Sequence, residues 1–335
     1  MAAVPVISSY VLQGVPAFVR EAAGEKVLRQ ANRAAGLDLE LIENRHCFIP
    51  QQALFSFVDA IGRVTGEPNL GLLLSPQMDV SRYGSFGSYV LGADTLGQAI
   101  HYGIEALKYH CTRDRLTVTS LGDEVRLGYH FALAGAGGYS VVACGAVGVL
   151  LSLFRAYLPH HWRPLRIELD IDTPSRKSAF EDVFQCPVLF NAPAVAVVVE
   201  RHHLATVAKR PSGPTVTLED VARDRPGGAP RSLLGVVTEQ VRAQVLTGRI
   251  MIDDVARSMD ISVRTLQREL QATGTDFRTL ANTLKIRRAT ELLRYTHGSI
   301  TQVSTELGYS SSAGFARAFR KMTGVGPREF RKQKG

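Results

Sequence analysis

Three polar side chains near the C-terminus have the types and the spacing to form paired hydrogen bonds with planar partners. They are Arg264, Gln267 and Arg268, at positions i, i+3 and i+4, so in a helix they share one face. Arginine can donate two hydrogen bonds to the edge of guanine, and glutamine can pair in the same way with adenine. The same arginines could instead contact phosphates, which position a protein without specifying a sequence.

A repeated pattern indicates how these side chains are presented. Two stretches, 48 residues apart, share the order small residue, turn former and serine: Ala256, Asp260 and Ser262, then Ser304, Gly308 and Ser310. A small residue lets two helices cross closely, while glycine easily, and aspartate tolerably, adopts the positive φ of a tight turn. Serine is a preferred N-cap, so both serines are predicted to start a second helix. The pattern is typical of two helix-turn-helix units.

The second helix of each unit is predicted to have a core face and an outward face. Leu266 faces the core in the first unit, and Phe315 does so in the second. The outward residues of the second unit are Ser312, Ala313 and Arg317. Serine and alanine are poor readers of bases apart from contact with a thymine methyl group, so the second unit is predicted to discriminate less than the first.

Nothing breaks a helix between Asp276 and Tyr295, and this segment is apolar on two sides. The two sets are Phe277, Leu280, Leu284 and Leu292, and Ile286, Ala289 and Leu293. A helix with two apolar sides is expected to be packed between two units. About 20 residues at 1.5 Å each span roughly 30 Å, close to the ~34–36 Å that separates recognition helices on DNA.

Residues 251–331 resemble the DNA-binding domain of AraC/XylS-type transcription regulators. The resemblance is carried by VARSMDISVRTLQREL, TELGYSS, FARAFRKMTG and GPREFR, with Asp260 in place of the usual glycine and Ser304 in place of the usual alanine. The first two-thirds of the chain is similar to the arabinose-binding-like sensor domain of some of these regulators. The resemblance implies a ligand-responsive transcription regulator, commonly an activator. It also implies that the protein binds double-stranded DNA and RNA polymerase, works in the cytoplasm and forms a homodimer.

Charge and length agree with a two-part organisation. The 335 residues suit two domains, and the net charge of +8 is unevenly placed. Residues 231–335 hold 18 Lys and Arg against 9 Asp and Glu, which leaves 21 against 22 elsewhere. A basic region beside a nearly neutral one is the electrostatic pattern of a protein that contacts phosphates. We expect a sensing and dimerisation domain over 1–208, a linker over 209–232 and an all-α double helix-turn-helix domain over 233–335.

The sensor region is predicted to be a mixed α/β domain. Two alternating runs, RLTVTSL and EVRLGYHFAL, flank Gly122 and Asp123 and predict a hairpin within a mixed or antiparallel sheet. A helix is predicted over Ala17–Ala35. The uncharged run Phe131–Phe154 is long enough to prompt a transmembrane assignment, but its glycine-rich first half favours a buried helix over a membrane span.

Residues for catalysis, metal binding or cofactor binding are not apparent. The chain has no phosphate-binding loop, nucleophile elbow or zinc motif, and its four cysteines lie far apart. We therefore expect no enzyme activity, metal or cofactor. Two alternatives stay open, namely a regulator controlled by a partner protein and an enzyme domain fused to a DNA-binding tail. Some aromatic residues are candidates for an effector pocket whose members are not predicted further: Phe55, Phe57, Tyr83, Phe86, Tyr89, Tyr102, Tyr109 and Tyr139.

Overall fold

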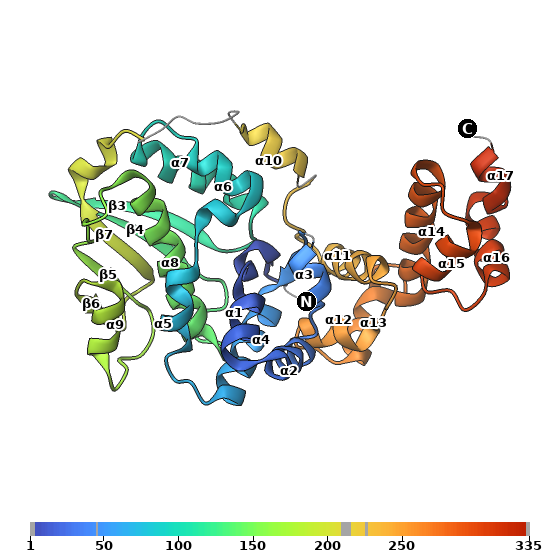
Figure 1. The fold of residues 1–335 in the computed structure, drawn as a ribbon, viewed down its shortest axis with the longest axis horizontal. Coiled ribbons are helices and arrows are strands. Elements are labelled where there is room, and N and C mark those ends of the chain that lie inside the picture. The colour runs from blue at the N-terminus through green and yellow to red at the C-terminus, as the bar shows by residue number, and fades with distance from the viewer. Residues whose placement is uncertain (1–3, 45, 209–215, 225–226, 333–335) are drawn as a thin grey trace.

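The computed structural model describes residues 4–44, 46–208, 216–224 and 227–332. An α/β region lies at one end of an elongated molecule and a purely helical region at the other (Figure 1). Most buried apolar side chains belong to two large clusters, one in each region. Val6 and Phe48 are exceptions, because they come from the first fifth of the chain but pack in the cluster of the helical region.

The α/β region is built on a five-stranded sheet in the order β3-β4-β7-β5-β6. Its strands are β3 (Arg115–Leu121), β4 (Glu124–His130), β5 (Arg166–Glu168), β6 (Val188–Leu189) and β7 (Val195–Glu200). All neighbours are antiparallel except β5 and β6, so the expectation of a mixed sheet is confirmed. The predicted hairpin is also present, with Leu121 opposite Glu124 across the turn at Gly122 and Asp123.

A long apolar helix, α8 (Tyr139–Tyr157), packs against β7 and the helices α4 (Gln51–Thr65) and α5 (Leu70–Leu74). By length and composition alone it is the one helix of the described residues that could cross a membrane. Ten of its residues are buried, including Phe154. The contacts agree with the prediction of a core helix over this run.

The remaining helices of this region are α1 (Val15–Ala23), α2 (Glu25–Ala35), α3 (Leu39–Asn44), α6 (Gly84–Leu91), α7 (Leu96–Ala106) and α9 (Lys177–Phe184). Of these, α7 and α9 pack on the sheet, and α2 packs on α1 and α4. The prediction of one helix over Ala17–Ala35 is wrong, because Gly24 breaks it with φ of +87°. Arg20 bridges the break, since its Nε lies 2.8 Å from Glu25 Oε2.

Two short strands, β1 (Val6–Ser8) and β2 (Phe48–Pro50), form an antiparallel ribbon beside the sheet. Val6 pairs with Pro50, and Ser8 pairs with Phe48. The ribbon was not predicted. Three residues are too few to show an alternating pattern, and the partner strand lies about 40 residues away in sequence.

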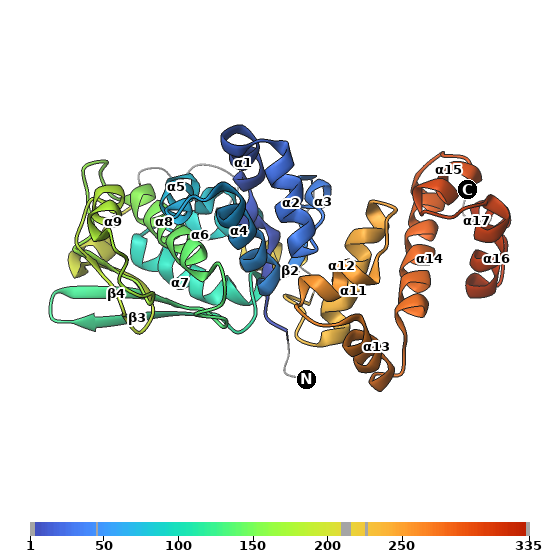
Figure 2. The same cartoon turned by 90° about the horizontal axis from the view of Figure 1, so that it is seen from below.

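The helical region contains α11 (Leu233–Leu246), α12 (Ile252–Ser258), α13 (Val263–Ala272), α14 (Phe277–Tyr295), α15 (Ile300–Glu306), α16 (Ser312–Thr323) and α17 (Pro327–Lys332). The long helix α14 begins after Asp276, whose side chain accepts from the backbone N–H of Thr279. It packs on α11 on one side and on α15, α16 and α17 on the other (Figure 2). The helix α14 is thus packed on two sides, as its two apolar faces predicted.

The segment that we expected to link the two regions is partly described. It contains the helix α10 (Leu218–Asp224), while 209–215 and 225–226 lie outside the described residues. The helix α10 packs on α6 through Val221, which is buried. Further on, the backbone N–H of Ala229 donates to the carbonyl oxygen of Lys108 at 3.3 Å. The described part of this segment therefore lies along the α/β region.

The two regions touch through α12 and α2 and through α11 and β2. Arg257 Nη1 donates to the carbonyl oxygen of Arg33 at 3.3 Å. Gly36, at the end of α2, approaches α12 so closely that a Cβ there would lie 2.4 Å from the carbonyl oxygen of Asp254. On the second contact, the buried Gln240 donates through Nε2 to the carbonyl oxygen of Phe48 at 2.6 Å.

Candidate DNA interface and effector cavity

The two predicted helix-turn-helix units end their first helices in the same way. In the first unit, Ile261 N donates to Ala256 O at 3.1 Å and Asp260 N donates to Arg257 O at 3.0 Å. This pair of bonds is a Schellman motif, which needs a residue with positive φ at the position of Asp260. Asp260 indeed has φ of +53°, as the sequence predicted.

The second unit repeats this geometry. Tyr309 N donates to Ser304 O at 3.0 Å, and Gly308 N donates to Thr305 O at 2.9 Å. Gly308 has φ of +69°, and a Cβ there would lie 2.4 Å from the carbonyl oxygen of Gly248. Ser304 is 2 % exposed, as is its counterpart Ala256, which fits the expected close helix crossing at both positions.

The N-caps of the second helices are predicted correctly in one unit. Ser262 caps α13, because its side chain accepts from the backbone N–H of Thr265 at 3.1 Å. The prediction of Ser310 as the cap of α16 is wrong. Ser311 caps that helix by accepting from Gly314 N at 3.1 Å, and Ser310 is exposed. The turn of the second unit is one residue longer, and a run of serines gave no signal to choose between them.

The helix α13 presents its three predicted donors to solvent. Leu266 and Leu270 are fully buried beneath it, while Arg264, Gln267 and Arg268 are exposed on the other side. The helix α16 is built alike, with Phe315 and Phe319 fully buried. On its outer side Ala313 and Arg317 are exposed, and Ser312 is half-buried with Oγ 3.4 Å from Thr301 Oγ1.

Two charged residues on these surfaces, Glu269 and Arg320, were not predicted from the sequence. Glu269 forms an ion pair with Arg268, with Arg268 Nη2 3.1 Å from Glu269 Oε1, and this hydrogen bond lowers the pKa of Glu269. Any DNA contact by Arg268 therefore competes with a neighbour in the free protein. Arg320 is exposed on α16 and follows Arg317 by three residues, so it extends the basic face by about one turn.

Several basic side chains of the helical region have structural partners. Arg288 lies 3.1 Å from Glu291 and 3.7 Å from Glu306, and Arg331 donates to the carbonyl oxygen of Gly298 at 2.7 Å. By contrast, neither Arg264 nor Arg317 has an ion-pair partner among the residues that the structure describes. These two arginines are the better candidates for contact with nucleic acid.

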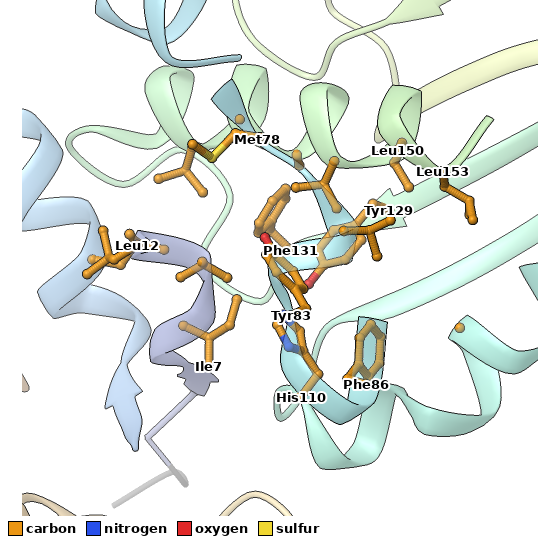
Figure 3. Close-up of a pocket in the computed structure, with 18 of the residues that line it drawn as sticks. Ile7, Leu12, Met78, Tyr83, Phe86, His110, Tyr129, Phe131, Leu150 and Leu153 are labelled. Carbon is orange, nitrogen blue, oxygen red and sulfur yellow. The ribbon is translucent and has the colours of Figure 1, made fainter. Parts of the chain in front are cut away.

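The α/β region contains an apolar cavity of about 130 Å³ between β1, the turn after it, α4, α6, α8 and the hairpin (Figure 3). Its lining includes Leu12, Leu150 and Phe131. Of the eight aromatic residues that we considered for a pocket, Tyr83 and Phe86 line it and the other six do not. The other two aromatic rings of the lining, Tyr129 and Phe131, come from the end of the hairpin and were not predicted.

The polar side chains of the cavity stand on one wall. The His110 ring stacks on Tyr83, with 5.1 Å between ring centroids, and lies 4.9 Å from the Phe86 ring. The Tyr129 hydroxyl donates to Asp114 Oδ2 at 2.8 Å. Burial raises the pKa of the Asp114 carboxyl, although its oxygens also accept from Gln51 and the backbone of Ala132.

The described part of the chain brings together neither a set of metal ligands nor a pair of bonded cysteines. Within the described ranges no three His, Cys, Asp or Glu side chains gather in a way that could hold a metal ion. No disulfide joins the four cysteines, of which Cys47, Cys111 and Cys144 are buried and Cys186 is half-buried.

Comparison with known proteins assigns both regions. Residues 28–207 match the family described as the arabinose-binding domain of AraC transcription regulator, N-terminal, and residues 255–333 match a helix-turn-helix domain family. The chain is 25 % identical over 280 residues to the ornithine utilization regulator of Pseudomonas aeruginosa, which covers 79 % of each protein.

Two further similarities cover different shares of the chain. The transcriptional activator RhaS of Escherichia coli is 36 % identical over 80 residues, which is 24 % of this chain and 29 % of RhaS. The crystal structure of the regulator CdpR from Pseudomonas aeruginosa aligns over 92 % of this chain and 97 % of its own, with 22 % identity and a TM-score of 0.42. The N-terminal family match spans more than half of the sequence and is followed by the helix-turn-helix match. The chain therefore belongs to the AraC family of DNA-binding transcription regulators.

Proposed function

We propose that this regulator reads its operator chiefly through Arg264, Gln267 and Arg268 on α13, and that α16 mainly anchors the complex through Arg317. The observation that carries this proposal is the exposure of three potential hydrogen-bond donors on one side of a capped helix whose other side is fully buried. The matching surface of α16 offers Ser312 and Ala313 beside its arginine, and these side chains distinguish bases poorly.

The length of α14 supports the placement of the two units in successive major grooves. Its 19 residues correspond to about 28 Å at 1.5 Å per residue. Recognition helices that enter successive grooves on one face of DNA are about 34–36 Å apart. A rigid spacer of nearly this length would let one chain contact two adjacent grooves.

The proposed division of the chain is a sensing and dimerisation domain over 1–208, a linker over 209–232 and a DNA-binding domain over 233–335. Two separate apolar clusters support this division. The apolar cavity of the first region favours control by a small molecule over control by a partner protein alone. In this proposal the protein acts in the cytoplasm as a homodimer that activates transcription by engaging RNA polymerase.

The proposal is tested by selecting DNA bound by the full-length chain from a random pool, then titrating single-base variants of the selected site at fixed salt. Arg264→Ala and Arg268→Ala should each cost about 1–3 kcal/mol of binding free energy, and at least one should relax preference at a definable base pair. Arg317→Ala should weaken binding more evenly across the variants. A sharper loss of specificity with Arg317→Ala than with both other variants would show that the two units have the opposite roles.

A further inference from the structure

The lining of the effector cavity is unusual in how little polarity it contains. Among its 25 residues, only Tyr83, His110 and Tyr129 carry a nitrogen or oxygen atom in the side chain, and none is an aspartate, glutamate, lysine or arginine. The rest are aliphatic, aromatic, glycine or methionine residues from the β1 ribbon, the surrounding helices and the hairpin (Figure 3). A ligand inside would therefore meet hydrocarbon on almost every side.

The few polar groups are already engaged or confined to one wall. The Tyr129 hydroxyl donates a hydrogen bond to Asp114 at 2.8 Å, and His110 is stacked on Tyr83. Burial raises the pKa of Tyr83 and Tyr129 above the usual range, so both phenols are neutral at physiological pH. This wall can provide a small number of hydrogen bonds, but the lining contains no Asp, Glu, Lys or Arg side chain to balance an ionic ligand.

Hydroxyl-rich and charged molecules are poor matches for such a lining. A buried hydroxyl without a partner weakens binding by about tenfold or more, and an unpaired charge weakens it far more. A pentose such as arabinose carries several hydroxyl groups distributed around its ring, whereas the polar atoms of the cavity stand on one side. The name of the matched family therefore does not describe the ligand that this cavity suits.

The volume sets the size of the occupant. A dry cavity of about 150 Å³ lined by leucine, isoleucine and phenylalanine is known to hold benzene or xenon. The cavity here, at about 130 Å³, is of that order and has a similar lining. An occupant of about six to eight non-hydrogen atoms is compatible with this space once side chains adjust by small rotations.

We propose that the cavity binds a small, uncharged and mostly hydrocarbon effector with at most one or two polar atoms directed at the wall formed by Tyr83, His110 and Tyr129. This proposal rests on the small-molecule control proposed above and names the chemical class of the molecule. Aromatic or short aliphatic compounds with a single hydroxyl or carbonyl group belong to this class, whereas sugars, amino acids and organic phosphates do not.

The chain offers a matched pair of glycines for a test. Gly145 of α8 lines the cavity, and a Cβ there would meet only Met78 Cγ, at 3.8 Å. Gly145→Leu should therefore fill the cavity from a helix that tolerates the change. Gly62 of α4 does not line it, and a Cβ there would meet only Leu70 Cδ2, at 4.0 Å, so Gly62→Leu is the control.

The experiment measures binding of toluene, phenol and L-arabinose to the full-length protein by calorimetry and by the shift in melting temperature. Toluene or phenol should bind at one site per chain and raise the melting temperature. Gly145→Leu should weaken that binding at least about tenfold, and Gly62→Leu should leave it unchanged. Arabinose should have no effect at the same concentrations. Binding of the apolar probes that is insensitive to Gly145→Leu, or arabinose binding that this variant removes, would overturn the proposal, as would no binding of either apolar probe.

A second variant keeps the test decisive if Gly145→Leu fails to fold. Leu150→Ala enlarges the cavity by removing a lining side chain, so it should admit naphthalene, which the original chain should bind at least tenfold more weakly. Equal naphthalene binding by both proteins would contradict the proposed site.

Titration of the selected operator in the same samples separates the proposed effector class from the proposed reading of DNA. Operator binding without probe binding rejects the effector class alone, whereas probe binding without sequence-selective operator binding rejects the proposed reading of DNA alone.

Discussion

The first helices of the two helix-turn-helix units end with the same hydrogen-bond geometry, but the two units have different neighbours. The first is held by the α/β region, because α12 packs on α2 and α11 packs on β2. The second lies at the far end of the molecule and packs on α14 (Figures 1 and 2). The donor-rich helix α13 thus belongs to the unit that contacts the sensing region, and α16 belongs to the distal one. The same geometry at the end of the first helix therefore does not mean equal roles for the two units.

The largest expected effect concerns the turn of the distal unit. Gly308→Ala would place a non-glycine residue at φ of +69° and a Cβ 2.4 Å from the Gly248 carbonyl oxygen. The backbone strain and the overlap together should lower the free energy of unfolding by about 2–4 kcal/mol. Gly324→Ala is the control, since Gly324 has φ of +83° but nothing within 4 Å of a Cβ. It should lose about 1–2 kcal/mol from strain alone. Urea denaturation of both variants measures the difference, and equal losses would mean that the contact with Gly248 is unimportant.

A smaller effect tests whether the first unit is held by the sensing region. Gln240→Ala would leave the buried carbonyl oxygen of Phe48 without the 2.6 Å hydrogen bond that it accepts, at a cost of about 1–3 kcal/mol. Amide hydrogen exchange should accelerate in β2 and α11 and stay unchanged in α16.

The matched change in the distal unit is Gln302→Ala. The Gln302 side chain accepts from Ser299 N at 2.6 Å in the capping box of α15. This variant should accelerate exchange in α15 and leave β2 as it is. If Gln240→Ala has no effect on β2, the contact between α11 and β2 does not hold the first unit in place.

Features of both regions that depend on a local pattern could be predicted from the sequence. The hairpin of β3 and β4 was predictable because both strands alternate and a two-residue turn joins them. The buried faces of α13 and α16 were predictable from helical periodicity. The cap of α16 was not, since Ser310, Ser311 and Ser312 are chemically alike and the turn length decides among them.

Features that depend on contacts between distant segments could not be predicted from local sequence patterns. The β1–β2 ribbon joins two three-residue strands, and neither shows a period. The apolar cavity of the α/β region is lined by Tyr83, His110 and Tyr129, although they come from three separate segments of the chain. Each of these residues is unremarkable in its own segment of sequence. Only the packing of the helices against the hairpin brings them to one wall.

The smallest expected effect concerns Asp260, where the turn of the first unit departs from its glycine counterpart in the second. Asp260 has φ of +53° and is exposed beside the N-terminus of α13. Asp260→Gly removes backbone strain but makes the unfolded chain more flexible, so the free energy of unfolding should change by less than about 1 kcal/mol. Both Asp260→Gly and Asp260→Asn remove a negative charge close to the proposed DNA surface, and asparagine also tolerates positive φ. Each should bind the operator severalfold more tightly at low salt, and the gain should shrink as salt screens the charge. A gain confined to the glycine variant would instead assign the effect to the turn, because asparagine leaves the side chain's size unchanged.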